Sequence, residues 1–169
     1  MLATFTSIPN GDVGTYVTVA HMRSLSRTAS YDPVTRTAAV KLVAGTSGKD
    51  GREQARTIRS FLEDHTSFLR DPHGTEALHD PKMLLRTILT GNIAYVDCDD
   101  VAMLAAALGL AIGLRARFVL LAFGTPSSPF RHVFAELGDP RTGRWYEMDI
   151  TRPAQDLPQR PTRVQALEV

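Results

Sequence analysis

Apolar positions spaced three and four residues apart give the clearest pattern in the first half of this chain. Between residues 52 and 65 these positions fall on one face of a helix, and two later ones continue the spacing. The positions are Ala55, Ile58, Phe61 and Leu62, continued by Phe68 and Leu69. The pattern predicts an amphipathic helix that buries this face.

Two Asp-Pro pairs mark the starts of further helices, at residues 32–33 and 80–81. An acidic N-cap followed by proline at the first helical position is preorganised for a helix. We therefore expect helices over about 32–43 and about 80–91. The stretch 13–30 mixes apolar and basic side chains and also has helical character.

The longest apolar run covers residues 101–114 and contains no charged side chain. Asp97 is placed as the N-cap of a helix over this run, with Asp100 three residues later in a capping-box-like arrangement. Because the run is apolar on nearly every side, other elements must enclose it. It is shorter than the roughly 18 apolar residues that indicate a membrane span. The sequence therefore predicts a buried central helix.

Three segments that alternate between apolar and polar residues follow, over 115–123, 130–137 and 144–150. Beyond Arg152, prolines at 153, 158 and 161 disfavour long regular elements, so an extended end is expected. This order of helices and strands predicts an α+β fold, with the central helix packed on an antiparallel sheet of three or more strands.

The composition narrows the possible partners and compartment. The chain has 169 residues, enough for one domain, and 19 basic against 18 acidic side chains give a net charge of +1. We therefore expect neither nucleic acid nor membrane as a partner. A single cysteine excludes an internal disulfide and suits a reducing compartment. Residues 1–6 lack the basic start and apolar core of a signal peptide, which predicts a cytoplasmic protein.

Cys98, the single cysteine, stands directly before the buried helix, where a thiol is placed for nucleophilic chemistry. A helix N-terminus together with an imidazolium lowers the pKa of a thiol from about 8.5 to about 3.5–7.5. The thiolate that results is the reactive form. The sequence must then supply a histidine close to this position.

The last two predicted strands can supply the histidine and a carboxylate. If they close symmetrically about the turn-rich loop 138–143, Leu137 faces Arg144 and His132 faces Asp149. Directly opposed residues share one sheet face, with Cβ atoms about 4.5–5.5 Å apart. We therefore predict that Cys98 is a nucleophile, His132 its base, and Asp149 the carboxylate that fixes the imidazole tautomer.

The oxyanion of a tetrahedral intermediate needs hydrogen-bond donors. The backbone N–H of Cys98 lies at the helix start, and Asn92 and Tyr95 are candidates for a second donor from their proximity in sequence. This mechanism requires no cofactor. Nearby aspartates disfavour a thiolate unless they face helix N–H groups or water, so Asp99 and Asp100 either cap the helix or position a cationic substrate group.

Other chemistry has less support, and structural roles remain open. His65, His73 and His79 are spaced by eight and six residues, which fits no compact zinc pattern, so we expect no metal site. A single buried cysteine is often a core residue. His132 can equally be a structural sheet residue, and Asp149 can cap a turn.

Three separate blocks resemble the transglutaminase-like superfamily of papain-like cysteine enzymes. Residues 95–117, with Cys98-Asp99-Asp100 and a helix rich in alanine and leucine, are similar to the family's core motif. Residues 132–136 resemble its histidine strand, and residues 145–149 resemble its aromatic-then-aspartate strand. The resemblance covers about 52–152 and implies a papain-like fold in which Cys98, His132 and Asp149 form the triad.

The resemblance also suggests an organisation for the chain. It implies an N-terminal helical extension over 1–50, a transglutaminase-like core over 51–152 and an extended C-terminal tail over 153–169. Members with this compact layout resemble proteins encoded by phages and bacteria. The resemblance therefore suggests a virion, with other phage structural proteins as partners, as an alternative to the cytoplasmic location.

Two departures from the family pattern bear on the reaction. Val96 stands where a glycine is frequent, and Asp99 where cross-linking members often have an aromatic residue. We therefore expect hydrolysis or acyl transfer at an amide bond of a peptide or protein rather than protein cross-linking. The alternative is a catalytically silent domain that serves as a structural component at a phage head or tail junction.

Overall fold

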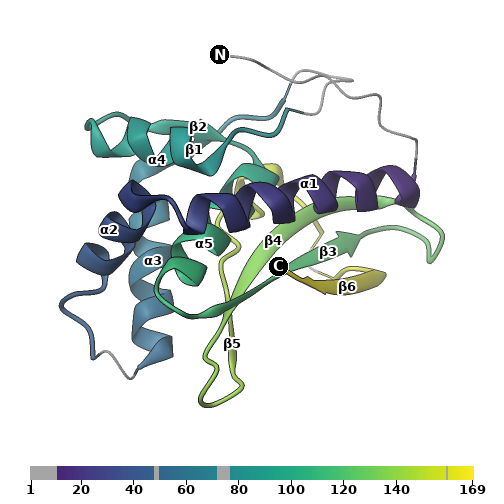
Figure 1. Ribbon diagram of the computed structural model, residues 1–169. Helices are drawn as coiled ribbons and strands as arrows, with labels where there is room; N and C mark the ends of the chain where they lie inside the picture. The colour runs from purple at the N-terminus through teal and green to yellow at the C-terminus, as the bar shows by residue number, and fades with distance from the viewer. Residues whose placement is uncertain (1–10, 48–49, 72–76, 159) are drawn as a thin grey trace.

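The protein is an α+β fold, as the sequence predicted. The computed structural model describes residues 11–47, 50–71, 77–158 and 160–169. Its larger sheet has four antiparallel strands in the order β5-β4-β3-β6, and helices cover one face of it (Figure 1). The expectation of no signal peptide depends on residues 1–6, which lie outside the described residues. His73 lies outside them as well.

The described residues form five α-helices, and aspartate side chains cap four of them. Each of these four aspartates accepts a hydrogen bond from a backbone N–H in the first turn, which satisfies groups that the helix itself leaves unbonded. The capping residues are Asp32, Asp50, Asp80 and Asp97. The helices are α1 (Asp12–Ser30), α2 (Pro33–Leu42), α3 (Gly51–His65), α4 (Pro81–Leu89) and α5 (Cys98–Ala111).

Helix α5 is the centre of the molecule, and its residues 99–109 are all buried. Helix α1 packs across it, where Ser26 Oγ donates to the carbonyl oxygen of Met103 at 3.3 Å. Near the other end, a Cβ on Gly109 would lie only 2.4 Å from Leu137 Cδ2, so α5 and β4 are in close contact. The enclosure predicted from the apolar run is confirmed. Among the described residues, no helix is both long and apolar enough to cross a bilayer.

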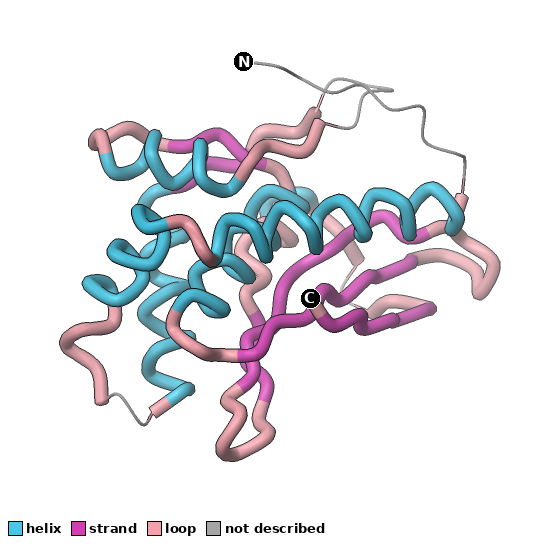
Figure 2. Tube along the Cα trace, in the orientation of Figure 1, coloured by secondary structure: helices cyan, strands magenta, loops and turns pink. Residues whose placement is uncertain are grey.

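The four strands of the larger sheet are β3 (Arg115–Ala122), β4 (Phe130–Gly138), β5 (Trp145–Glu147) and β6 (Arg163–Glu168), drawn magenta in Figure 2. The segment after Arg152, expected to be an extended end, contributes β6 as an edge strand beside β3. Its three prolines all precede β6, so they leave the strand's own hydrogen bonds intact. Tyr16 Oη of α1 donates to Gln165 Oε1 of β6 at 2.6 Å.

A second, two-stranded parallel sheet joins β1 (Thr66–Phe68) to β2 (Ala94–Val96). The predicted continuation of α3 through Phe68 and Leu69 is therefore wrong. Helix α3 ends because Thr66 is extended, with φ −121° and ψ 154°, and its hydroxyl donates to the carbonyl oxygen of Leu62. Strand β2 runs directly into Asp97 and α5, which fixes where the helix begins.

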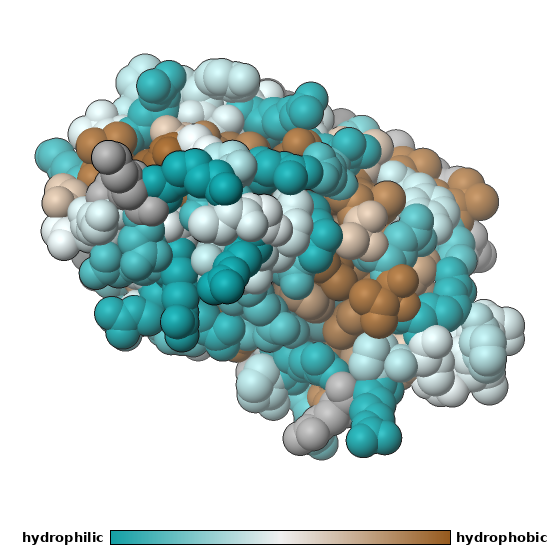
Figure 3. Space-filling view, turned by 90° about the horizontal axis from the view of Figure 1, so that it is seen from below, coloured by the Kyte–Doolittle hydropathy of each residue, from teal (hydrophilic) through white to brown (hydrophobic). Residues whose placement is uncertain are grey.

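The two faces of the larger sheet carry separate apolar clusters. On the helix side, residues of β3 and β4 join the large core around α5. A smaller cluster combines Val119, Leu121, Phe123 and Phe134, with Leu157 packed against it. Seen from below, the surface is mainly hydrophilic, and hydrophobic side chains show in several places, with a prominent patch right of centre (Figure 3).

Candidate active site

Cys98 is the first residue of α5, where the sequence placed it. Asp97 caps the helix, its Oδ1 accepting from the backbone N–H of Asp100 at 3.4 Å. The Cys98 side chain is half-buried and packs against the core on the helix side of the sheet. The thiol thus stands at the positive end of the helix dipole, which favours a thiolate.

The acidic residues after Cys98 are turned into the protein. Asp100 is buried, and both its oxygens accept from His79: Oδ1 from the backbone N–H at 2.9 Å, and Oδ2 from the ring Nδ1 at 2.7 Å. Burial and the neighbouring Asp97 raise the pKa of Asp100 to about 6, although the bonds from His79 oppose this. Asp100 therefore holds the loop that carries His79 against α5.

His79 is the charged partner of this contact. Partial burial disfavours its protonated form, but Asp100 outweighs that effect, together with Asp71 and Asp97, and the pKa of His79 is raised. Asp71 accepts from the backbone N–H of Ala77 at 2.6 Å; burial and the nearby Asp97 raise its pKa. The start of α5 therefore lies in a negatively charged surrounding that one imidazole partly neutralises.

The hairpin that carries the other two candidate residues has a register two residues away from the predicted one. The observed pairs are Glu136 with Glu147 and Leu137 with Tyr146. The turn closes at Asp139, whose N–H donates to the carbonyl oxygen of Arg144 at 2.9 Å. The predicted pairing of Leu137 with Arg144 and of His132 with Asp149 as directly opposed strand residues is therefore wrong.

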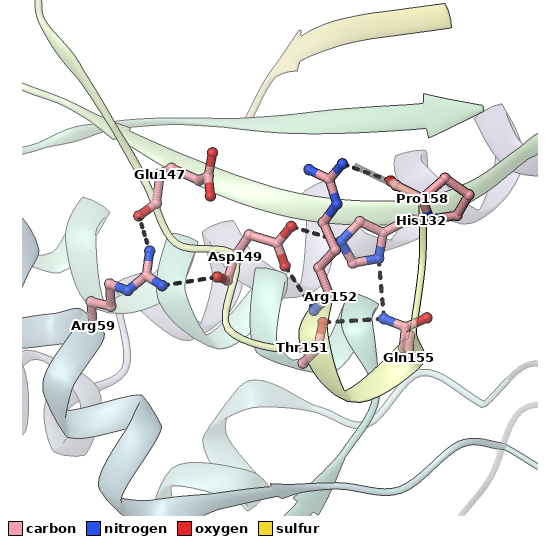
Figure 4. A network of polar contacts seen from close by, with 8 residues as sticks. All are labelled: Arg59, His132, Glu147, Asp149, Thr151, Arg152, Gln155 and Pro158. Carbon is pink, nitrogen blue, oxygen red and sulfur yellow. Dashed lines mark hydrogen bonds and ion pairs between the residues drawn. The ribbon is translucent and has the colours of Figure 1, made fainter. Parts of the chain in front are cut away.

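His132 and Asp149 nevertheless meet, because a shift of two residues keeps the same sheet face. His132 Nε2 lies 2.9 Å from Asp149 Oδ2, and the two side chains are only 0% and 2% exposed. Asp149 Oδ1 also accepts from the backbone N–H of Arg152 at 3.2 Å. Strand β5 ends at Glu147, so Asp149 reaches His132 from the segment that follows the strand (Figure 4).

Arg59 of α3 holds this segment from the helix side. Its guanidinium donates to the carbonyl oxygen of Glu147 at 3.2 Å and to that of Asp149 at 3.1 Å (Figure 4). Burial and the Asp149 charge raise the pKa of the Glu147 carboxyl, although Arg59 opposes this. The carboxylate that contacts His132 is therefore anchored through its own backbone.

Gln155 is a second hydrogen-bond partner of His132, and the sequence analysis missed it. Its amide Nε2 lies 3.1 Å from His132 Nδ1 and 3.3 Å from the Thr151 hydroxyl (Figure 4). An amide nitrogen only donates, so Nδ1 accepts here and the ring proton sits on Nε2, facing Asp149. Gln155 belongs to the short 3₁₀ helix η1 (Pro153–Gln155), and no sequence pattern distinguishes it from other surface glutamines.

The two candidates for a second oxyanion donor lie near the start of α5. Asn92 Nδ2 donates to the Thr90 hydroxyl at 3.0 Å, in the turn between α4 and β2. Tyr95 is on β2 with its side chain 63% exposed, whereas its neighbours Ala94 and Val96 are buried. Both side chains lie on the outside of the molecule, Tyr95 three residues and Asn92 six residues before Cys98.

Among the described residues, Asp97, Asp99 and Asp100 are the group whose ligand atoms could hold a cation, since these lie within 4.8 Å of one another. Asp97 already accepts from the α5 backbone, and Asp100 accepts twice from His79. Of the histidines considered for zinc, His65 Nδ1 faces the carbonyl oxygen of Phe61 at 2.8 Å.

Comparison with known proteins shows a likeness of fold. No protein-family model matches the chain, and no curated protein matches it. A crystal structure of a "putative protease" from Parabacteroides distasonis ATCC 8503 is similar to it, with a TM-score of 0.57 and 15% sequence identity. The alignment covers 78% of this chain and 26% of that one, so this chain spans about a quarter of the neighbour's length.

Proposed function

We propose that the protein is a cysteine-dependent amide hydrolase or acyl transferase with a papain-like, transglutaminase-like fold, in which Cys98, His132 and Asp149 act together on a peptide or protein amide. The observation that carries this proposal is the buried contact between His132 Nε2 and Asp149 Oδ2 at 2.9 Å. It holds the imidazole in the tautomer whose Nδ1 can accept a proton. No cofactor takes part.

The reaction follows from that tautomer. The S–H bond of Cys98 breaks as its proton passes to His132 Nδ1, and the thiolate attacks the carbonyl carbon of the substrate amide. The backbone N–H of Cys98 donates to the oxyanion, with Asn92 or Tyr95 as second donor. His132 then gives its proton to the leaving amine as the C–N bond breaks. Water, or another amine, resolves the thioester that remains.

The relation of α5 to β4 supports a meeting of Cys98 and His132. Helix α5 packs on the sheet, and only three residues join it to β3. The helix therefore runs antiparallel to β3 and parallel to β4. Its contact with β4 joins Gly109 to Leu137. From there, eleven helical residues back to Cys98 and five strand residues back to His132 each cover about 16 Å. The thiol and the imidazole therefore stand at a similar level along the sheet.

Strand alternation places the His132 side chain on the face of the sheet opposite α5, which the proposed contact with Cys98 must accommodate. His132 shares its face with Phe134, whose ring centroid is 6.1 Å away, whereas Val133 belongs to the core beneath α5. β5 ends at Glu147, so the first half of β4 lacks a strand on that side. Cys98 packs on the helix side of the sheet and His132 lies on the other face, so the thiol and Nδ1 would have to meet around this edge of β4, where the segment with Asp149 and Gln155 lies in place of a strand.

The Parabacteroides protein has a similar fold and is named a "putative protease", which supports the same class of reaction for this chain. The departures at Val96 and Asp99 favour hydrolysis over cross-linking. We assign the substrate only to the class of peptide or protein amides, because specificity resides in loops around a site rather than in its catalytic groups.

Acylation of Cys98 by an activated ester tests the proposal. An N-acetyl amino acid p-nitrophenyl ester should leave an acyl group on Cys98, detected by mass spectrometry after acid quenching, and Cys98→Ala should take up none. His132→Ala should react about 10²–10⁴-fold more slowly, the usual contribution of a general base. His65→Ala removes an imidazole that contacts the Phe61 carbonyl oxygen, and this variant should react like the parent protein.

Two results would contradict the proposal. Acylation at equal rates with and without His132 would show an ordinary surface thiol. A parent protein that forms no adduct at all would favour the catalytically silent domain.

A further inference from the structure

The Gln155 side chain is hydrogen-bonded to Nδ1 of His132, the nitrogen that the proposed reaction needs as proton acceptor. The Gln155 amide Nε2 lies 3.1 Å from Nδ1, while Asp149 occupies Nε2 of the same ring. The His132 side chain is fully buried, so no solvent competes for either nitrogen. Both ring nitrogens of His132 are therefore bonded in this structure.

This contact opposes the first proton transfer. In the proposed reaction the thiol proton moves to Nδ1, so the S–H bond breaks and an N–H bond forms there. The Gln155 amide already donates to the lone pair that must receive this proton. After transfer, the new N–H would point at the N–H of the amide, and two donors that face each other cannot bond.

We propose that η1 is a latch, with Gln155 as the positioning residue that covers Nδ1 of His132 until the segment moves. This inference rests on the proposed function: the latch affects activity only if His132 is a base, because only a base needs Nδ1 to be accessible. The capped state holds the reactive tautomer ready, and release of Gln155 exposes the lone pair to the thiol.

Apart from the bond to His132, the hydrogen bonds of Gln155 go to Thr151 and Arg152 of the same segment, so Gln155 can leave His132 without breaking a strand-to-strand hydrogen bond. Gln155 bonds to Thr151 through its own N–H, at 3.2 Å, and through its side chain. Arg152 donates to the carbonyl oxygen of Pro158 at 2.9 Å and lies over the ring of Phe123. Asp156 ends η1 in the left-handed region with φ 52°, which is unfavourable for a residue other than glycine.

Removing Gln155 should therefore increase reactivity. In Gln155→Ala, carbethoxylation of His132 by diethyl pyrocarbonate, followed by mass spectrometry, should be about fivefold faster, the factor that corresponds to one hydrogen bond. Alkylation of Cys98 by iodoacetamide should rise by a similar factor, and the rise should vanish in Gln155→Ala/His132→Ala. Gln155→Leu keeps the side-chain volume and should change both rates in the same direction. Gln165→Ala on β6 is the matched control and should match the parent protein.

The two readouts separate the latch from the proposed function. Unchanged or slower carbethoxylation of His132 in both Gln155 variants would overturn the latch. Faster carbethoxylation with unchanged alkylation of Cys98 would support a cap on His132 and contradict the coupling of Cys98 to His132. A rise in Cys98 alkylation that persists without His132 would show simple exposure of the thiol, and it would also overturn the latch.

Discussion

The contact between His79 and Asp100 makes the start of α5 sensitive to pH. The pKa of His79 is raised by Asp100 against the effect of partial burial, and burial raises the pKa of Asp100 to about 6. A group with a raised pKa in the folded state stabilises the fold fully below its unfolded pKa and loses this contribution as the pH rises through its folded pKa. The unfolded values are near 6.5 for His79 and 3.8 for Asp100.

We therefore expect His79→Ala to destabilise the protein more at pH 6 than at pH 8.5. The loss at pH 6 should be up to about 1 kcal/mol, because the ring is 44% exposed and solvent screens the pair. Urea unfolding of both proteins at the two pH values measures the difference.

The backbone N–H that donates to Asp100 remains in His79→Ala, so the comparison isolates the ring. His21→Ala, which removes an exposed imidazole of α1, serves as the matched control. A loss from His79→Ala that is equal at pH 6 and pH 8.5 would refute the assignment of a charged contact.

The residues around His132 show what the sequence could and could not predict. The shared sheet face of His132 and Asp149 follows from strand alternation, which survives a shift of two residues. Gln155 could not be found, because it contacts His132 from a short 3₁₀ turn 23 residues away in sequence. Such turns have no periodic pattern, and a glutamine amide suits solvent as well as a buried ring.

At the scale of elements, the closest approach is that of α5 to β4 at Gly109. A Cβ there would lie 2.4 Å from Leu137 Cδ2, and Leu137 is fully buried. Overpacking of this kind costs about 1–3 kcal/mol, whereas replacing glycine by alanine within a helix gains about 1 kcal/mol. Gly109→Ala should therefore lower the free energy of unfolding by up to about 2 kcal/mol, as measured by urea unfolding.

The same substitution should have the opposite sign when Leu137 is shortened. In a Leu137→Ala background the clash is gone, so Gly109→Ala should stabilise the protein by about 1 kcal/mol through helix propensity alone. Equal effects of Gly109→Ala in both backgrounds would mean that α5 and β4 do not meet at these side chains.

The hairpin register illustrates a limit at this scale. A symmetric loop is the simplest reading of a turn-rich segment, but local bonds decide the register. Asp139 accepts from the backbone N–H of Arg141 at 2.9 Å, and the N–H of Gly143 donates to the carbonyl oxygen of Asp139 at 2.8 Å. Gly143 takes a positive φ of 70°, which favours glycine. These bonds form a tight four-residue turn, which moves the closing pair by two residues.

At the scale of the whole molecule, local patterns predicted the helices and the α+β class, but pairings between distant segments were missed. The parallel pairing of β1 with β2 joins residues that are 28 positions apart in sequence. Strand β6 pairs with β3 although β4 and β5 lie between them in sequence. β1 and β2 have three residues each, too few for a periodic pattern, and the prolines that precede β6 led to the expectation of an extended end there. The core and its central helix depend on long apolar runs, which the sequence shows directly.

The central claim is that the Cys98 thiol at the start of α5 and the His132 imidazole on β4 act as one unit. The most direct measurement is the rate of Cys98 alkylation by iodoacetamide near pH 6, in the parent protein and in His132→Ala. We predict that the parent protein reacts much faster than an ordinary free thiol and that His132→Ala loses this advantage. Equal, slow alkylation of both proteins would contradict the account.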